Sequence, residues 1–137
     1  MTGAQPAGFT AVIADDDPDI ATLMEIAVRR AGGTVLAVAH DGTGAWDRIR
    51  ELGPDLALLD VSMPGLTGVE VCRLVRDNTA RAGGAGPLVV LLSAAVHPAA
   101  VAQGLEAGAE RYLAKPFSPR SLAEELTRAL RAKGNTP

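Results

Sequence analysis

Four short apolar runs, each followed directly by a polar residue, constrain the fold of this chain more than any other feature of its sequence. The residues that follow them are Asp15, Asp60, Ser93 and Lys115. Segments in which apolar residues recur at helical spacing separate these runs along the chain. Apolar runs of strand length that alternate with helices indicate a parallel sheet covered by helices on both faces.

Turn and capping residues divide the chain into five strands, each followed by a helix. We expect strands at about 10–15, 34–39, 55–60, 88–92 and 110–114. Residues typical of N-caps and first helical turns start the helices at Asp17-Pro18, Asp41, Thr67, His97-Pro98 and Ser118-Pro119. Because crossovers between parallel strands are right-handed, five such units favour a doubly wound α/β fold with strand order 2-1-3-4-5.

The length, charge and cysteine content of the chain limit its class. A chain of 137 residues suits one domain, which we expect to span residues 9–132 between tails at 1–8 and 133–137. The net charge of −3 and the pI of about 5.3 argue against nucleic acid as a direct partner, since that would require a basic face. No apolar stretch reaches the length of a membrane span, and the lone Cys72 excludes a disulfide within the chain and suits a cytoplasmic location.

The polar ends of the predicted strands indicate a metal site. The carboxyl ends of parallel strands meet at one edge of a sheet, so Asp15, Asp16 and Asp60 are expected to lie close together. Three neighbouring carboxylates repel one another, and a bound cation removes that repulsion. Oxygen ligands of this kind suit Mg²⁺ or Mn²⁺ rather than zinc. The histidines His40 and His97 are far apart in the sequence and are expected to be surface or loop residues.

The same edge carries the groups that phosphoryl transfer requires. Asp60 is the expected nucleophile, because a carboxylate can accept a phosphoryl group as an acyl phosphate. Lys115 can neutralise charge on the transferred group, and its flexible stem carries a compact charge that arginine does not offer. Ser93 can donate a hydrogen bond to a phosphoryl oxygen, and Ala94 beside it leaves space for that group.

Taken together, these motifs resemble the receiver domain of bacterial two-component response regulators. The segments that carry the resemblance are Val12-Ile13-Ala14-Asp15-Asp16-Asp17-Pro18, Asp55 to Gly68, Val89 to Ala94 and Gly108 to Phe117. The resemblance covers about residues 9–132. It implies a flavodoxin-like, or CheY-like, fold with five helices around the sheet.

The resemblance implies a chemical role for each residue of the site. Asp60 would accept a phosphoryl group from a histidine of a sensor kinase or phosphotransfer protein, and Lys115 would pair with that group. Asp16 would bind Mg²⁺ directly and Asp15 mainly through water, with the backbone carbonyl of Ser62 as a further ligand. Such a domain assists its own phosphorylation and dephosphorylation and is not an enzyme acting on a separate substrate.

The resemblance also implies how a signal leaves the site. Ser93 would be the switch hydroxyl and Tyr112 the switch aromatic, which turns inward when Ser93 moves toward the phosphoryl group. The Lys115–Pro116 bond would be cis. The face formed by the fourth helix, the fifth strand and the fifth helix would then change shape. Gly104, inside the fourth helix, lowers helix propensity there by about 1 kcal/mol relative to alanine, which is consistent with a moving element.

The partner and the oligomeric state stay open at this point. The receiver is either a stand-alone protein acting on an effector or part of a longer regulator with its own output domain. It is a monomer or a phosphorylation-dependent dimer. Glu110-Arg111 stands where an acidic pair is usual, and Glu125 where a basic residue is common, which disfavours the dimer that many related receivers form.

Two other functions remain as alternatives. A phosphohydrolase with an aspartate nucleophile would usually have an acid two residues after that nucleophile, where this chain has Ser62. A receiver-like binding module that works without phosphorylation would usually lack one of the key residues, and this chain lacks none of them.

Overall fold

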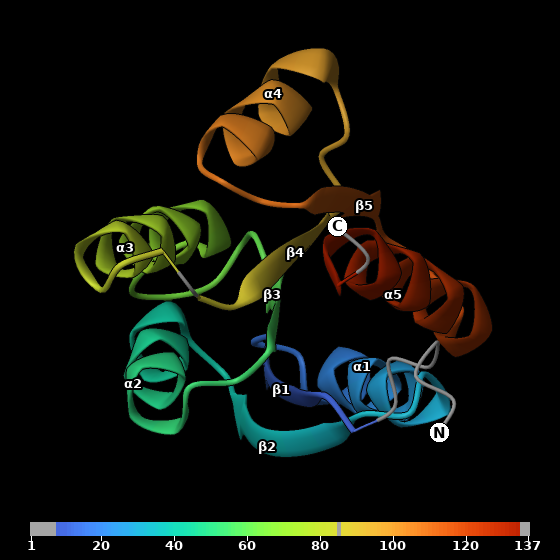
Figure 1. Cartoon of the computed structure of the whole chain (residues 1–137). Helices are drawn as coiled ribbons and strands as arrows, with labels where there is room; N and C mark the ends of the chain where they lie inside the picture. Colours follow the sequence, from blue (N-terminus) through green and yellow to red (C-terminus); the bar gives the residue numbers. More distant parts are fainter. Residues whose placement is uncertain (1–7, 85, 135–137) are drawn as a thin grey trace.

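Five strands alternate with five helices over residues 8–84 and 86–134, which are the residues that the computed structural model describes (Figure 1). In chain order the elements are β1 Thr10–Ala14, α1 Pro18–Arg30, β2 Thr34–Ala39, α2 Gly42–Leu52, β3 Leu56–Asp60, α3 Gly68–Arg81, β4 Leu88–Ser93, α4 Pro98–Glu106, β5 Arg111–Ala114 and α5 Pro119–Gly134. The strand boundaries lie within one residue of those predicted from the sequence.

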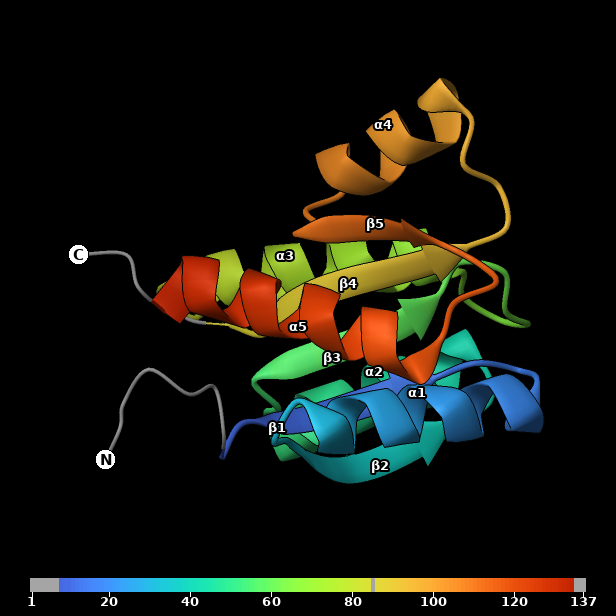
Figure 2. The same cartoon turned by 90° about the vertical axis from the view of Figure 1, so that its right-hand side faces the viewer.

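The sheet is parallel throughout, and its strand order is β2-β1-β3-β4-β5, which confirms the predicted order. The register places Asp60 opposite Leu92 and Ser93 opposite Ala114. In Figure 2 the arrowheads of the strands point to the same end of the molecule, so the loops that follow the strands gather there. This end is where the predicted site residues belong.

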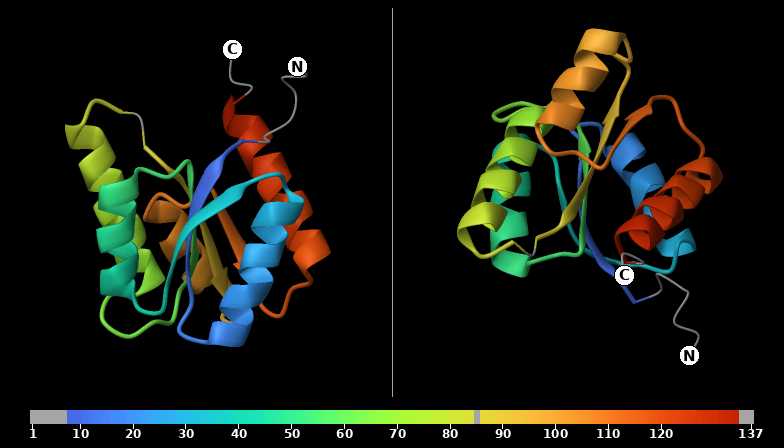
Figure 3. Two further views of the ribbon diagram at one scale, coloured as in Figure 1. Left: turned by 90° about the horizontal axis from the view of Figure 1, so that it is seen from below. Right: turned by 45° about the horizontal axis from the view of Figure 1, so that its top comes forward.

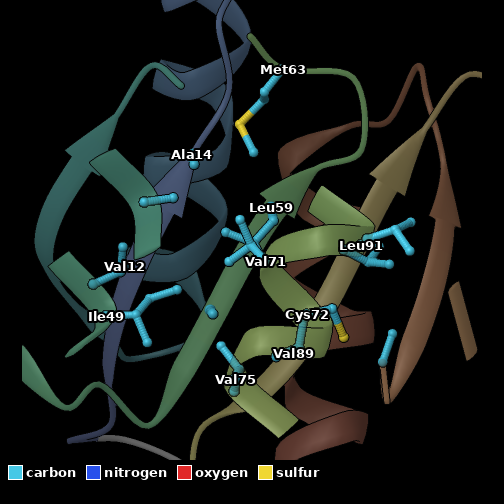
Figure 4. Close-up of a cluster of buried hydrophobic side chains, with 14 of the residues drawn as sticks. Val12, Ala14, Ile49, Leu59, Met63, Val71, Cys72, Val75, Val89 and Leu91 are labelled. Atoms are coloured by element: carbon cyan, nitrogen blue, oxygen red, sulfur yellow. The ribbon is translucent and has the colours of Figure 1, made fainter. Parts of the chain in front are cut away.

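The sheet has a hydrophobic core on each face because side chains alternate between faces along every strand. Val12, Ala14, Leu59 and Leu91 belong to the core under α2 and α3, and in Figure 4 Val71 of α3 lies against Leu59. Residues of the other core come from the alternate strand positions and from α1 and α5: Ala11, Ile13, Leu58, Val90, Leu92, Met24, Ala27, Val28, Leu122, Ala123, Leu126 and Ala129. The central strands β3 and β4 are buried along their whole length.

Side-chain caps fix where the helices begin. Asp17 accepts a hydrogen bond from the Asp19 N–H, and Asp41 accepts one from the Gly44 N–H. At the start of α3, Thr67 and Glu70 form both hydrogen bonds of a capping box. These caps satisfy N–H groups that a helix leaves unpaired, and they set how the loops leave the site.

Helix α4 stands apart from the other helices at the β5 edge of the sheet (Figures 2 and 3). Its last carbonyls are held by α3, because Arg76 Nη1 donates to the Glu106 carbonyl at 3.0 Å and Cys72 Sγ donates to the Ala107 carbonyl at 3.4 Å. Gly104 is the one buried residue of α4, a helix that the structure describes completely. The helix is therefore attached to the sheet over a small area.

The described helix α5 continues to Gly134, two residues past the predicted domain boundary at 132. Of the two predicted tails, only Gly8 and residues 133–134 are described. The rest of both tails lies outside the described residues. Within the part of the chain that the structure describes, no helix has the length and apolar character needed to cross a membrane.

Candidate phosphoacceptor and metal site

Asp60 ends the central strand β3 and is 3% exposed. The strand before it is apolar on both faces and is covered by helices on both sides, which fixes its backbone in the middle of the sheet. The loop that follows turns sharply, because the Gly68 N–H donates to the Val61 carbonyl at 2.9 Å. A Cβ on Gly68 would lie 2.4 Å from the Asp60 carbonyl oxygen, so only glycine fits this return.

Asp15 and Asp16 follow β1, and the structure brings them to Asp60 as predicted. One carboxylate oxygen from each of the three residues lies within 4.8 Å of the others. Asp15 is fully buried and Asp16 is exposed. Asp15 Oδ1 accepts a hydrogen bond from the Asp17 N–H at 2.9 Å, which orients the carboxylate.

Lys115 reaches this cluster from the end of β5. Its Nζ donates a hydrogen bond to Asp60 Oδ1 at 3.1 Å and lies 3.0 Å from Asp15 Oδ2 as an ion pair. The Lys115–Pro116 peptide bond is cis, which confirms the prediction. One ammonium group therefore contacts two buried carboxylates.

Burial and charge shift the pKa values of this pair. Burial raises the pKa of the Asp60 carboxyl, and the charge of Asp15 raises it further. Lys115 and the Ser62 backbone N–H favour the ionised form, but the pKa stays above its usual value. For Lys115 burial lowers the pKa, yet the contacts with Asp15 and Asp60 outweigh it, so the pKa is raised and the ammonium stays charged.

Ser93 and Tyr112 meet at the backbone of Ala95. Ser93, 5% exposed at the end of β4, accepts a hydrogen bond at Oγ from the Ala95 N–H at 3.0 Å. The Tyr112 hydroxyl donates to the Ala95 carbonyl at 2.6 Å. The two residues predicted to form the switch are therefore connected through one residue of the β4–α4 loop.

The carboxylate cluster suits a hard divalent cation. All three predicted acidic ligands offer oxygen, and no histidine or cysteine belongs to the group among the described residues. Asp15 Oδ2 is buried and has Lys115 Nζ as its ion-pair partner at 3.0 Å. Asp16 is exposed to solvent, and Mg²⁺ usually keeps several waters when carboxylates bind it. The Ser62 carbonyl stays a predicted further ligand.

His40 makes a contact that its place in the sequence does not indicate. Its Nδ1 lies 3.0 Å from the backbone carbonyl oxygen of Asp15, so the residue supports the loop that carries the acidic pair. The two residues are 25 positions apart, and nothing in the spacing of the histidines indicated this contact. His97 caps α4, accepting at Nδ1 from the Ala100 N–H at 3.3 Å.

A doubly wound parallel sheet with an acidic pair, a buried aspartate, a serine and a lysine at its carboxyl edge defines the CheY-like receiver class. The chain belongs to the response regulator receiver domain family, whose model matches residues 11–127. It is therefore the receiver domain of a response regulator, a class of signalling protein.

The relatives agree with this assignment. The DNA-binding response regulator MtrA of Mycolicibacterium smegmatis is 39% identical over 126 residues, which are 92% of this chain and 52% of MtrA. The chain thus spans about half the length of the curated relatives it matches. The signal receiver domain of NarL from Mycobacterium tuberculosis superposes with a TM-score of 0.83 at 30% identity, over 92% of this chain and 98% of that one. The Francisella response regulator 1452 receiver domain gives 0.79 at 28% identity, over 93% and 99%.

Proposed function

We propose that Asp60 is the phosphoacceptor of this receiver and takes its phosphoryl group from a phosphohistidine of a sensor kinase or phosphotransfer protein. The observation that supports this most directly is the contact of Lys115 Nζ with Asp60 Oδ1 at 3.1 Å. It sets a fixed positive charge beside the carboxylate that would become an acyl phosphate. The two residues reach this contact from the ends of separate strands, β3 and β5.

The transfer exchanges one phosphorus bond for another. A carboxylate oxygen of Asp60 forms a P–O bond as the P–N bond to the donor imidazole breaks, and the imidazole nitrogen keeps the electron pair. Lys115 neutralises charge that develops on the phosphoryl oxygens. A divalent cation held by Asp15, Asp16 and Asp60 supplies further positive charge to those oxygens when it is bound. The domain thus assists a reaction on its own side chain.

The switch follows from the hydrogen bonds around Ala95. A serine hydroxyl that accepts a hydrogen bond can still donate its own proton, so Ser93 can bond to a phosphoryl oxygen. Movement of Ser93 toward that oxygen would change its hydrogen bond with the Ala95 N–H. A shift of Ala95 would then change the hydrogen bond that its carbonyl accepts from the Tyr112 hydroxyl. The signal would leave through α4, β5 and α5. Phosphorylation shifts the balance between two conformations by stabilising one of them more than the other.

The partners form part of the same proposal. A sensor kinase would dock at the edge that carries Asp60, and an effector protein or an output domain would read the α4-β5-α5 face. DNA binding is a property named for the MtrA relatives, of which this chain matches about half the length. We place the domain in the cytoplasm, where the reduced state of the buried, free Cys72 would be kept.

Intact-mass measurement after treatment with acetyl phosphate and Mg²⁺ tests the phosphoacceptor assignment. The wild type should gain the mass of one phosphoryl group, Asp60→Asn should gain none, and Asp77→Asn should behave as the wild type. Asp77 is a suitable control because it lies exposed on α3. Equal gains in wild type and Asp60→Asn would refute the assignment. No gain in the wild type would favour a binding module, and continuous release of phosphate from a generic phosphomonoester would favour a phosphohydrolase.

A further inference from the structure

Gly104 lies where the ring of Tyr112 meets α4. A Cβ on Gly104 would lie 2.5 Å from Tyr112 Cδ2, 2.9 Å from Cε2 and 3.1 Å from Leu91 Cδ1. Cβ atoms do not approach ring carbons as closely as 2.9 Å, so a larger residue at this position requires the Tyr112 ring or the helix to shift. Gly104 is also the one buried residue of the fully described helix α4. Its place in the helix thus has a packing reason beyond low helix propensity.

The Tyr112 ring is held on its other sides as well. Its hydroxyl donates to the Ala95 carbonyl at 2.6 Å, and its backbone pairs with Leu91 in the register of β4 and β5. Leu91 is fully buried, and Tyr112 packs against the core cluster to which Leu91 belongs. A displacement of the ring that carries the hydroxyl away from Ala95 would break this hydrogen bond.

We propose that Gly104 is a positioning residue for the switch: its missing Cβ leaves the space that the Tyr112 ring occupies while the Tyr112 hydroxyl donates to the Ala95 carbonyl. The Ala95 N–H donates to Ser93 Oγ, so the seat at Gly104 also positions Ser93 beside the site.

The effect on Ser93 rests on the proposed function, whereas the packing of the Tyr112 ring against Gly104 does not. The two parts therefore need separate measurements. A glycine that merely weakened α4 would have the opposite signature, because alanine in its place would strengthen the helix. The sign of the change in melting temperature distinguishes these two readings of Gly104.

The seating is tested in the unmodified protein by NMR, using the fact that Tyr112 is the only tyrosine of the chain. With ring-labelled tyrosine, the wild type should show nuclear Overhauser effects from the ring protons to the Gly104 α-protons and to a Leu91 δ-methyl group. In Gly104→Ala the ring contacts with Leu91 should weaken and the melting temperature should fall. Ala102→Gly, at an exposed position of the same helix, controls for helix propensity.

The coupling to the site is tested by the rate of phosphoryl gain at Asp60 from acetyl phosphate. Gly104→Ala should slow this gain several-fold in the wild-type background. In a Tyr112→Ala background the same change should have no further effect on the rate, because there is no ring left to displace. In the Tyr112→Ala background Gly104→Ala should also cause no further fall in melting temperature, whereas a purely local helix effect would be the same in both backgrounds.

Three results would overturn the inference: no ring contacts with Gly104 in the wild type, a higher melting temperature for Gly104→Ala, or an equal slowing by Gly104→Ala in both backgrounds. A wild type that gains no phosphoryl group would defeat the proposed function. In that case the NMR contacts and the melting temperatures still decide whether Gly104 seats Tyr112.

Discussion

Lys115 Nζ donates a hydrogen bond to Asp60 Oδ1 at 3.1 Å, although the two residues are 55 positions apart in the chain. The same ammonium group is the ion-pair partner of Asp15, which is fully buried. Two buried carboxylates thus share one positive charge. Removal of one partner from a buried ion pair leaves an uncompensated charge, which costs far more than the pair itself contributes.

Lys115→Met should lower the free energy of unfolding of the metal-free protein by about 3 kcal/mol. The loss should be largest at neutral pH and smaller in acid. Burial raises the pKa of Asp60, so the folded protein neutralises this carboxyl at a higher pH than the unfolded chain does, and the destabilisation develops as pH rises through that interval. Urea unfolding at several pH values measures both effects.

Lys133→Met is the matched control, because Lys133 is the only other lysine and lies exposed near the end of α5. It should leave the free energy of unfolding nearly unchanged. A Lys115→Met protein as stable as this control would contradict the view that the two carboxylates depend on the ammonium.

Addition of Mg²⁺ should raise the melting temperature relative to protein in a chelator, because an ion that binds only the folded state stabilises it, and the stabilisation grows with the logarithm of the ion concentration above the dissociation constant. The site gathers Asp15, Asp16 and Asp60 oxygens within 4.8 Å of one another. Asp16→Asn should remove most of the Mg²⁺-dependent shift. Asp47→Asn removes an acid of the same charge from α2 and should preserve the Mg²⁺-dependent shift. A shift that survives in Asp16→Asn would place the ion elsewhere.

Much of the fold was predictable because the decisive signals are local. The apolar runs of β1, β3 and β4 are surrounded by capping residues such as Asp17 and Thr67, and right-handed crossovers leave few strand orders open. The meeting of Asp15, Asp60 and Lys115 then follows from parallel strands alone. Their side chains come from strand ends, and the carboxyl ends of parallel strands share one edge.

The contacts that were not predictable depend on where separate elements come to rest. His40 reaches the Asp15 carbonyl only through the loop after β2, and the Gly68 backbone fits against Asp60 only in the folded β3–α3 turn. Gly104 showed in the sequence as a residue of low helix propensity. Its contact with Tyr112 depends on the distance between α4 and β5, which no local pattern encodes.

Cys72 should react slowly with a neutral alkylating reagent in the folded protein. The side chain is 1% exposed, and burial raises the pKa of its thiol to about 11 against lowering effects of Arg76 and Arg73. At about pH 8 almost no thiolate is present, and the thiolate is the nucleophile. The raised pKa also means that stability falls as pH rises from the unfolded value of 9.0 toward 11.

Time-resolved alkylation followed by intact mass measures this protection. Denatured protein provides the comparison, since the same thiol should then react readily. Rapid modification of the folded protein at neutral pH would show that the contact of α3 with the end of α4 opens frequently.

Arg76→Ala should loosen the C-terminal end of α4 without unfolding the domain. Arg76 Nη1 donates to the Glu106 carbonyl at 3.0 Å, and a Cβ built on Gly108 would lie 3.5 Å from Arg76 Cβ. Loss of one such hydrogen bond costs about 0.5–1.5 kcal/mol, so local opening should become up to about tenfold more frequent.

Amide hydrogen exchange at Ala107 and Ala109 reports this opening, because their N–H groups bond to carbonyls of α4. Arg73→Ala, an exposed residue of the same helix, should leave these amides unchanged. Equal exchange rates in the two variants would show that α4 is held at this end by the backbone alone.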